Sequence, residues 1–231
     1  MPDGDLIAFI TYITQILMSL IMVTMMFMFS SRAIASARRI SEVLDENADI
    51  TDKDALQKDR VITSGKVEFK NVSFRYYKTS EGKVLDNINL TVNPGETVGI
   101  IGSTGCGKTT LVSLIPRLYD ADEGEVLVDG VNVRDYSLYH LRESVGMVLQ
   151  KNVLFSGTIE DNLRWGDENA TDEQIKAACE SAQANLFIQS FTDGYQTELD
   201  QGGTNVSGGQ KQRLCIARAL LKNPKILILD D

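Results

Sequence analysis

The sequence predicts an α/β domain with a helical subdomain, preceded by one apolar helix. Three observations support this fold class: strand-like apolar segments fill residues 66–149, helical periodicity dominates residues 157–223, and residues 6–29 carry no charge. An apolar strand at residues 226–229 follows the helical region, which is the order expected of a sheet interrupted by a helical insertion. The hydrophobic fraction of 43% over 231 residues is sufficient for a buried core.

The uncharged segment Leu6–Phe29 is long enough to cross a membrane. As a helix it would be about 36 Å long, against about 30 Å for the hydrocarbon layer. The alternatives are a secretory signal, which has basic residues before a shorter apolar core, and a buried helix of a soluble domain. Two aspartates precede the segment and three arginines follow it, so everything after Arg32 is predicted to be cytoplasmic.

Apolar residues recur at helical spacing from Ile34 to Leu44, and neither Pro nor Gly separates them from the uncharged segment, so one long helix is predicted to leave the membrane. Residues 47–65 are polar and charged, which is typical of a linker. We therefore divide the chain into a membrane helix with its cytoplasmic extension (1–46), a linker (47–65) and a globular domain (66–231).

The globular domain begins with a strand whose apolar phase shifts between Phe69 and Val72, which indicates a turn or bulge. Thr171 with Gln174 three residues later predicts a capped helix start. Further strands are predicted at residues 84–92, 96–101, 125–130, 144–149 and 226–229.

The net charge of −9 and the isoelectric point near 4.7 argue against a nucleic acid as the main partner. The three cysteines are widely spaced and form no CxxC pair, so neither a disulfide framework nor a zinc site is predicted. His140, the only histidine, lies on an amphipathic stretch and is interpreted as a surface residue rather than a catalytic base.

The stretch GSTGCGKTT matches the pattern GxxxxGK[ST] between a predicted strand and a predicted helix. Its glycines let the backbone aim several N–H groups at phosphate oxygens, and the helix start adds partial positive charge. Lys108 would neutralise phosphate charge and the Thr109 hydroxyl would bind Mg²⁺, so ATP and Mg²⁺ are the predicted cofactors. The candidate nucleotide-binding residues of this loop are Gly102, Ser103, Thr104, Gly105, Cys106, Gly107, Lys108, Thr109 and Thr110. Cys106 could be a reactive thiol, but we interpret it as contributing only its backbone.

A second phosphate site is predicted where a Ser-Gly-Gly turn opens the helix after Val206. Its residues are Ser207, Gly208, Gly209 and Gln210. One nucleotide has no evident use for two such sites unless two copies of the domain face each other, each offering its turn to the other's ATP.

At these residues the chain resembles the ABC transporter ATPases, because VSGGQ is similar to the family's LSGGQ signature and the resemblance extends from about Val67 to Asp231. The resemblance implies that Gln150 helps to hold Mg²⁺ and links the nucleotide to the membrane part. It also implies that Tyr76 stacks on adenine, the alternative being an ordinary strand aromatic. The stretch LFSGTIEDNLRWG and the membrane helix directly ahead resemble exporters, in which such a chain carries six membrane helices; the one present resembles the last.

The final stretch ILILDD resembles the Walker B strand, whose first carboxylate, Asp230, would hold Mg²⁺ together with Thr109 and Gln150. The family usually has Glu at the next position as the base for the attacking water, whereas this chain has Asp231. The shorter side chain would misplace its carboxylate by about 1 Å, which can slow a reaction about a hundredfold. Gln201 also stands where exporters commonly have Glu.

Both departures resemble the subunit of heterodimeric exporters that carries a weak hydrolytic site. We therefore expect three partners. They are a second exporter subunit, whose active site the intact signature would complete, membrane lipid, and an unidentified solute. We expect an integral protein of the cell membrane with a cytoplasmic ATPase domain.

The chain also stops before the family's switch histidine, so we interpret it as a piece of a longer exporter chain that is inactive by itself. The alternatives are a soluble ABC ATPase acting on nucleic acid or ribosomes, and a nucleotide-binding regulatory module without turnover.

Overall fold

The computed structural model describes residues 3–77 and 82–230. Its contacts divide the chain into two compact units, Met1–Asp49 and Ile50–Asp231, which are described separately below. The bounds predicted for the linker, 47–65, therefore straddle the division after Asp49.

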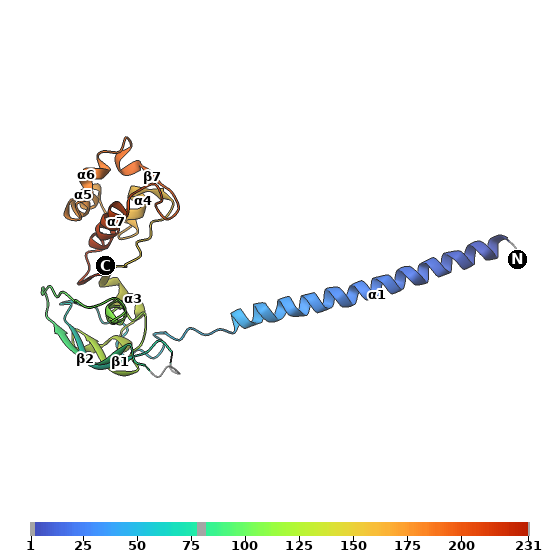
Figure 1. The fold of residues 1–231 in the computed structure, drawn as a ribbon, viewed down its shortest axis with the longest axis horizontal. Coiled ribbons are helices and arrows are strands. Elements are labelled where there is room, and N and C mark those ends of the chain that lie inside the picture. The colour runs from blue at the N-terminus through green and yellow to red at the C-terminus, as the bar shows by residue number, and fades with distance from the viewer. Residues whose placement is uncertain (1–2, 78–81, 231) are drawn as a thin grey trace. The chain divides into compact units, whose positions relative to one another are not determined.

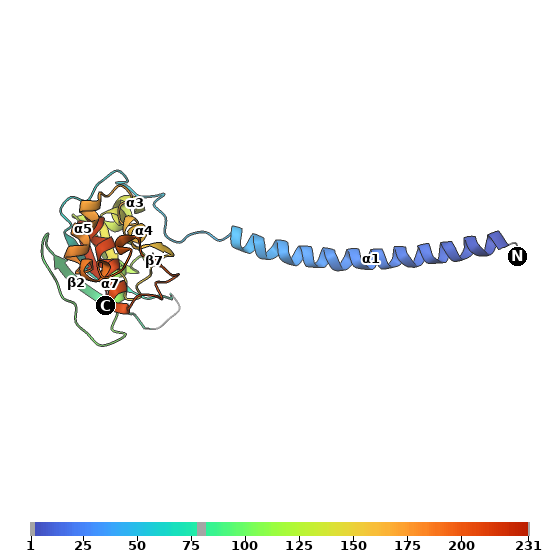
Figure 2. The same cartoon turned by 90° about the horizontal axis from the view of Figure 1, so that it is seen from above.

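The first unit is the helix α1 (Asp3–Leu44), which runs without interruption for 42 residues, as predicted (Figures 1 and 2). Its side chains are exposed, and by length and composition it is the one helix within residues 3–77 and 82–230 that could cross a membrane. Five of its hydroxyl groups donate to the carbonyl four residues earlier, which satisfies them within the helix as a lipid environment requires. The donors are Thr11, Thr14, Ser19, Thr24 and Ser31.

The second unit contains an antiparallel sheet in the order β2-β1-β3-β4. Its strands are β1 (Val67–Phe74), β2 (Leu85–Val92), β3 (Glu123–Val128) and β4 (Val131–Asn132). The predicted irregularity in β1 is confirmed, because its register shifts after Phe69 against β2 and Asn71 has a φ of 51°. The shift keeps both Phe69 and Val72 buried although they are three residues apart.

A parallel pair, β5 (Val145–Val148) and β8 (Ile226–Leu229), lies in the same core as the antiparallel sheet. Apolar side chains from α2 (Lys108–Ser113) and α3 (Leu138–Glu143) join this core, and the short helix η1 (Val133–Asp135) precedes α3. The core therefore fixes the ends of β5 and β8 relative to the start of α2.

The helical subdomain predicted at residues 157–223 has a separate core (Figure 1). Its three helices with capping boxes begin after Thr158, Thr171 and Ser207, so the start predicted at Thr171 is confirmed. Its elements are β6 (Gly157–Thr158), α4 (Ile159–Arg164), α5 (Asp172–Ser181), α6 (Asn185–Ile188), η2 (Gly194–Gln196), β7 (Glu198–Leu199) and α7 (Gly208–Leu221).

The strand predicted at residues 96–101 is wrong, since these residues form no ladder with another strand in the structure. Ile101 is 98% exposed and Val98 and Ile100 are each 40% exposed. An apolar run indicates only that a segment can be buried, whereas a strand also needs a neighbouring backbone in register. The other predicted strands are formed, with shifts of a few residues at their ends.

The capping box of α5 provides a test of the helical subdomain. Replacing Thr171 with Ala removes the acceptor for the Gln174 N–H and should lower the free energy of unfolding by about 1 kcal/mol, while Ser should have little effect. The single tryptophan, Trp165, stacks on Phe155 at 4.8 Å and reports unfolding in urea by its fluorescence. Equal stability of the Ala and Ser variants would contradict this role of the cap.

Candidate functional site

The loop at residues 102–110 surrounds the ammonium group of Lys108. Gly105 and Gly107 have φ values of 84° and 92°, which side-chain-bearing residues rarely adopt, and α2 begins directly after Gly107. The Lys108 Nζ donates to the carbonyl oxygens of Gly102 at 2.8 Å and Ser103 at 3.1 Å. The loop thus places a cation beside the start of a helix, where negative charge is favoured.

The hydroxyl of Thr109 donates to Oδ1 of Asp230 at 3.0 Å, across 121 residues of sequence. Asp230 follows β8 directly, and its backbone N–H donates to the carbonyl of Val148 at 2.9 Å, which fixes it to the end of β5. The parallel pair therefore brings the two predicted metal ligands together.

The other carboxylate oxygen of Asp230, Oδ2, is buried and has no hydrogen-bond partner among the residues that the structure describes. A buried carboxylate oxygen without a partner is unfavourable, and a hard cation that prefers oxygen ligands would satisfy it. Thr109 and Asp230 therefore fit Mg²⁺.

Gln150 is exposed and lies two residues after β5. Since β5 and β8 are parallel, Gln150 and Asp230 leave the pair at the same end, as expected if both face the cation. The predicted base, Asp231, lies outside the described residues.

Tyr76 lies beside the start of α2, because its hydroxyl is 2.8 Å from Oγ1 of the buried Thr110. Its ring also meets those of Phe74 and Tyr119 edge-on, with centroids 5.0 and 5.2 Å apart. The ring remains accessible, since Tyr76 is 48% exposed. An exposed aromatic face next to the phosphate loop suits the predicted adenine contact.

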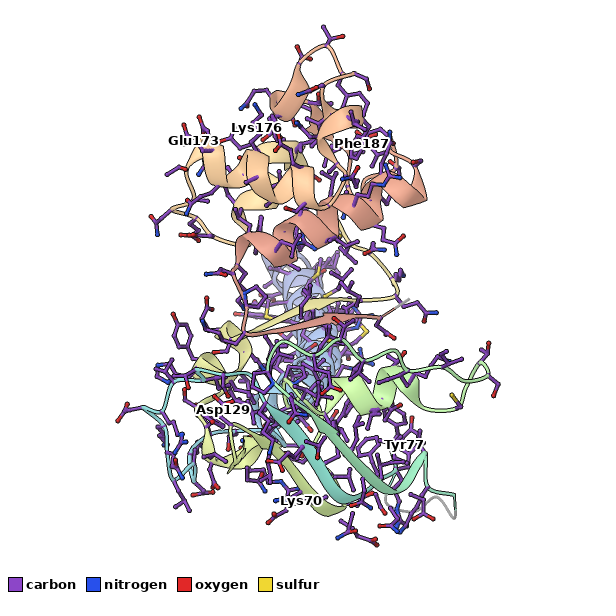
Figure 3. The ribbon with its side chains drawn as sticks, turned by 90° about the vertical axis from the view of Figure 1, so that its left-hand side faces the viewer. Lys70, Tyr77, Asp129, Glu173, Lys176 and Phe187 are labelled. Carbon is purple, nitrogen blue, oxygen red and sulfur yellow. The ribbon has the colours of Figure 1, made fainter. Side chains whose placement is uncertain are left out.

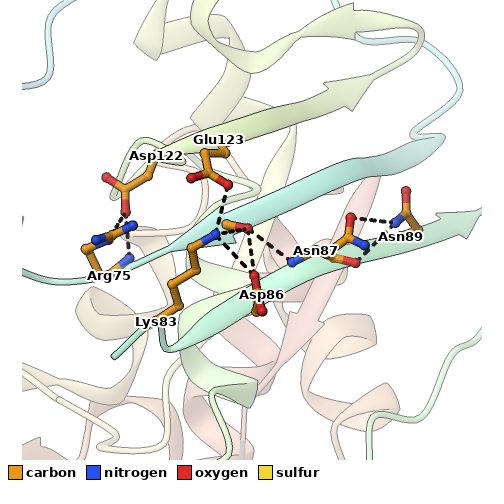
Figure 4. Close-up of polar contacts among 8 residues, drawn as sticks. Arg75, Lys83, Asp86, Asn87, Asn89, Asp122 and Glu123 are labelled. Carbon is orange, nitrogen blue, oxygen red and sulfur yellow. Dashed lines mark hydrogen bonds and ion pairs between the residues drawn. The ribbon is translucent and has the colours of Figure 1, made fainter. Parts of the chain in front are cut away.

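A polar network, drawn in Figure 4, holds the β1–β2 region that carries Tyr76. Asp122 accepts the backbone N–H of Arg75 at 2.8 Å and lies 3.4 Å from its guanidinium. Lys83 contacts Glu123 at 2.9 Å and Asp86 at 3.2 Å, and hydrogen bonds to these two carboxylates raise the pKa of Lys83. The sequence analysis missed this network, because charges some 40 residues apart give no local signal of pairing.

The second predicted phosphate site lies at the exposed start of α7. The Ser207 hydroxyl accepts the N–H of Gln210 at 3.3 Å, and the Gln210 side chain accepts the N–H of Ser207 at 2.8 Å. A Cβ added at Gly208 or Gly209 would meet nothing within 4 Å, so the backbone of the first turn is open to a ligand. Apolar residues of α7 pack in the second core, whereas α2 packs in the first, so the two predicted phosphate sites belong to different cores.

Comparison with known proteins identifies the family, because residues 85–231 match the family described as ABC transporter. The chain belongs to the ABC transporter family. The matched range includes Thr109, Asp230 and residues 207–210, whose roles as Mg²⁺ ligands and signature turn stay predictions.

Two curated relatives are long exporter-type proteins. An ATP-binding/permease protein of Bacillus subtilis named for multidrug export, YgaD, is 46% identical over 229 residues, which are 99% of this chain and 39% of the relative. The ATP-dependent lipid A-core flippase of Syntrophus aciditrophicus is 45% identical over 201 residues, 87% of this chain and 33% of the relative.

A solved structure of a bacterial Atm1-family ABC exporter with ATP bound is similar to this fold, with a TM-score of 0.82 and 34% identity. The match covers 98% of this chain and 39% of that one. The ABC chain thus spans about two fifths of the length of the multidrug-export relative and of the solved exporter.

The carboxylate of Asp230 should be needed for the Mg²⁺-dependent part of ATP binding. Asp230→Asn is expected to bind ATP similarly with Mg²⁺ and with EDTA, because the variant loses the charge that holds the cation. Lys108→Ala is expected to weaken binding under both conditions. Calorimetry of the four combinations checks this, and a full Mg²⁺ effect in Asp230→Asn would contradict the assignment.

Nucleotide should protect one cysteine from alkylation. Cys106 is exposed inside the loop, whereas burial raises the pKa of Cys179 to about 11 and also raises that of Cys215. At neutral pH the two buried thiols hold almost no thiolate, so Cys106 should react first with maleimide. Mass spectrometry should find this labelling slowed by MgATP in the wild type and unaffected by MgATP in Lys108→Ala. Rapid labelling of Cys179 would contradict the prediction.

Proposed function

We propose that this chain is the ATP-binding part of an ABC exporter subunit that couples ATP binding and hydrolysis to outward movement of a solute. The observation that carries the proposal is the 3.0 Å contact between Thr109 and Asp230 beside the loop that holds Lys108. A lysine binds the phosphates of a nucleoside triphosphate, and a hydroxyl with a carboxylate binds its Mg²⁺.

Each part of the nucleotide has a group suited to it. The backbone N–H groups of residues 102–110 and the Lys108 ammonium bind and orient the phosphates. Thr109 and Asp230 hold Mg²⁺, which neutralises charge on the phosphates when bound. The ring of Tyr76 stacks on adenine. Gln150 helps Thr109 and Asp230 to hold the cation.

The subunit's own site turns ATP over slowly, because Asp231 is one methylene shorter than the glutamate usual in the family and Gln201 replaces another glutamate. Its signature turn is complete and open, with Ser207 and Gln210 forming a capping box. We infer that this turn completes an active site on a different exporter subunit, so the functional unit is a heterodimer.

Helix α1 anchors the subunit in the cell membrane, and the ATPase part lies on the cytoplasmic side. The support is the uncharged run Leu6–Phe29, with basic residues on its C-terminal side. The transported solute is bound by membrane helices of the full-length pair.

The test uses the full-length subunit purified with its partner. Asp231→Ala should leave ATPase activity within about twofold of the wild type, whereas replacing the partner's catalytic glutamate by Gln should lower it about a hundredfold. Ser207→Ala should also lower activity strongly, because it removes a group that serves the partner's ATP. Thr171→Ala, which alters a cap of similar geometry away from the signature, is the matched control. Equal losses from the two catalytic replacements would refute the asymmetric pair.

A further inference from the structure

Residues 50–66, here called the strap, form no helix or strand but are fixed to the ATPase part at several points. They follow α1 after only five residues, 45–49. Ile62 is 1% exposed and belongs to the same core as Ile226 and Ile228 of β8. The strap therefore shares a core with β8, the strand that Asp230 directly follows.

Asp129, which is labelled in Figure 3, accepts hydrogen bonds from the C-terminal end of the strap. It lies in the turn between β3 and β4, where its carboxylate accepts the backbone N–H groups of Thr63, Ser64 and Lys66 at 2.8, 2.9 and 2.9 Å. The hydroxyl groups of Thr63 and Ser64 donate to the same carboxylate. One side chain thus satisfies five donors of the strap.

These bonds favour the ionised carboxylate. Partial burial would raise the pKa of Asp129, but the hydrogen bonds from Ser64, Thr63 and Lys66 outweigh burial and lower the pKa to about 2. Because the folded-state pKa lies below the unfolded value of about 3.9, this contribution to stability is complete above pH 4 and is lost as the pH falls towards 2. The attachment is therefore intact at physiological pH.

The N-terminal part of the strap is held by single hydrogen bonds. Asp52 accepts the N–H of Leu138 at 3.2 Å, the N–H of Gln57 donates to the carbonyl of Asp135 at 2.8 Å, and the carbonyl of Lys58 lies 2.7 Å from Nδ1 of His140. A single hydrogen bond is worth about 1 kcal/mol between neutral groups and about 1.5–3 kcal/mol with a charged acceptor such as Asp52, so each contact is weaker than the five-donor Asp129 cluster. The sole histidine, interpreted from the sequence as a surface residue, is half-buried and contacts the strap.

Gly65 brings the strap against the start of β8. Its φ is 76°, and a Cβ at this position would lie 2.5 Å from the carbonyl oxygen of Lys225. Only glycine permits this approach, which places the strap directly beside the strand that leads to Asp230.

We propose that the strap, anchored by Asp129, transmits movement of the ATPase core to α1, with Asp129 as the positioning residue for this coupling. The inference rests on the proposed exporter function. It assigns to residues 50–66 a mechanical role rather than that of a flexible linker.

The length of free chain explains why the anchor matters. With the strap attached, five residues join α1 to the ATPase part. A flexible chain has an r.m.s. end-to-end distance of about 5–6 Å times the square root of its length, or about 12 Å for five residues and about 25 Å for the 20 residues 45–64. The longer chain leaves α1 about twice as much freedom relative to the core as the shorter one, so it transmits movement of the core less directly. Detaching the strap should therefore uncouple α1 from the core without changing the nucleotide site.

The test compares the wild type with Asp129→Asn in the full-length subunit, with its partner, in lipid nanodiscs. Spin labels introduced as unnatural amino acids at Ser36 of α1 and Glu173 of α5 leave Cys106 unmodified. The wild type should give a narrow distance distribution that shifts with MgATP and vanadate. In Asp129→Asn, hydrogen exchange at residues 57–66 should be about tenfold faster, and the distance shift should be lost, while KM and kcat for ATP stay within about twofold.

Asp167→Asn is the matched control, since Asp167 accepts the N–H of Asn169 at 2.9 Å in a turn away from the strap. Ser64→Ala, which removes one hydroxyl donor, should show an intermediate loss and tests the idea if Asp129→Asn does not fold. Faster exchange with an unchanged distance shift, unchanged exchange, or a rise in KM for ATP would each overturn the coupling role. Failure of the wild type to bind MgATP would instead overturn the proposed function.

Discussion

The candidate nucleotide site depends on the contact between the hydroxyl of Thr109 and the carboxylate of Asp230. Neither group could be held there by local structure, since Thr109 lies in the first turn of α2 and Asp230 directly follows β8. Four paired positions of β5 and β8 and the burial of Ile226 and Ile228 set the height at which Asp230 leaves the sheet. The apolar core thus supplies the precision, while the polar groups supply the chemistry.

The same contact leaves one oxygen of Asp230 buried and unpaired among the described residues. Leaving a buried polar group without a partner costs about 1–3 kcal/mol, and more when the group is charged, whereas a typical hydrogen bond contributes about 1 kcal/mol. The strand end is therefore suited to a cation rather than to maximal stability. An unpaired buried group of this kind is expected at a binding site, where a protein is less stable than it could be because the group serves a ligand.

The features that the sequence predicted correctly are mostly local. The capping box at Thr171, the helix start after Ser207 and the irregular strand at residues 67–74 each depend on residues close together in the chain. The features that were missed join distant residues. Asp129 meets Ser64 across 65 residues and Lys83 meets Glu123 across 40, and neither pairing leaves a periodic pattern. The proximity of Thr109 and Asp230, 121 residues apart, was expected only because the resemblance to a family placed both at one site, and periodicity gave no sign of it.

The segment at residues 96–101 combines exposed Val98, Ile100 and Ile101 with backbone groups outside any ladder. Such a segment is a template for pairing with another chain, particularly as it contains no proline and a single charge. Pairing through this segment would bring a second chain directly beside the phosphate loop, so self-association there would interfere with nucleotide binding.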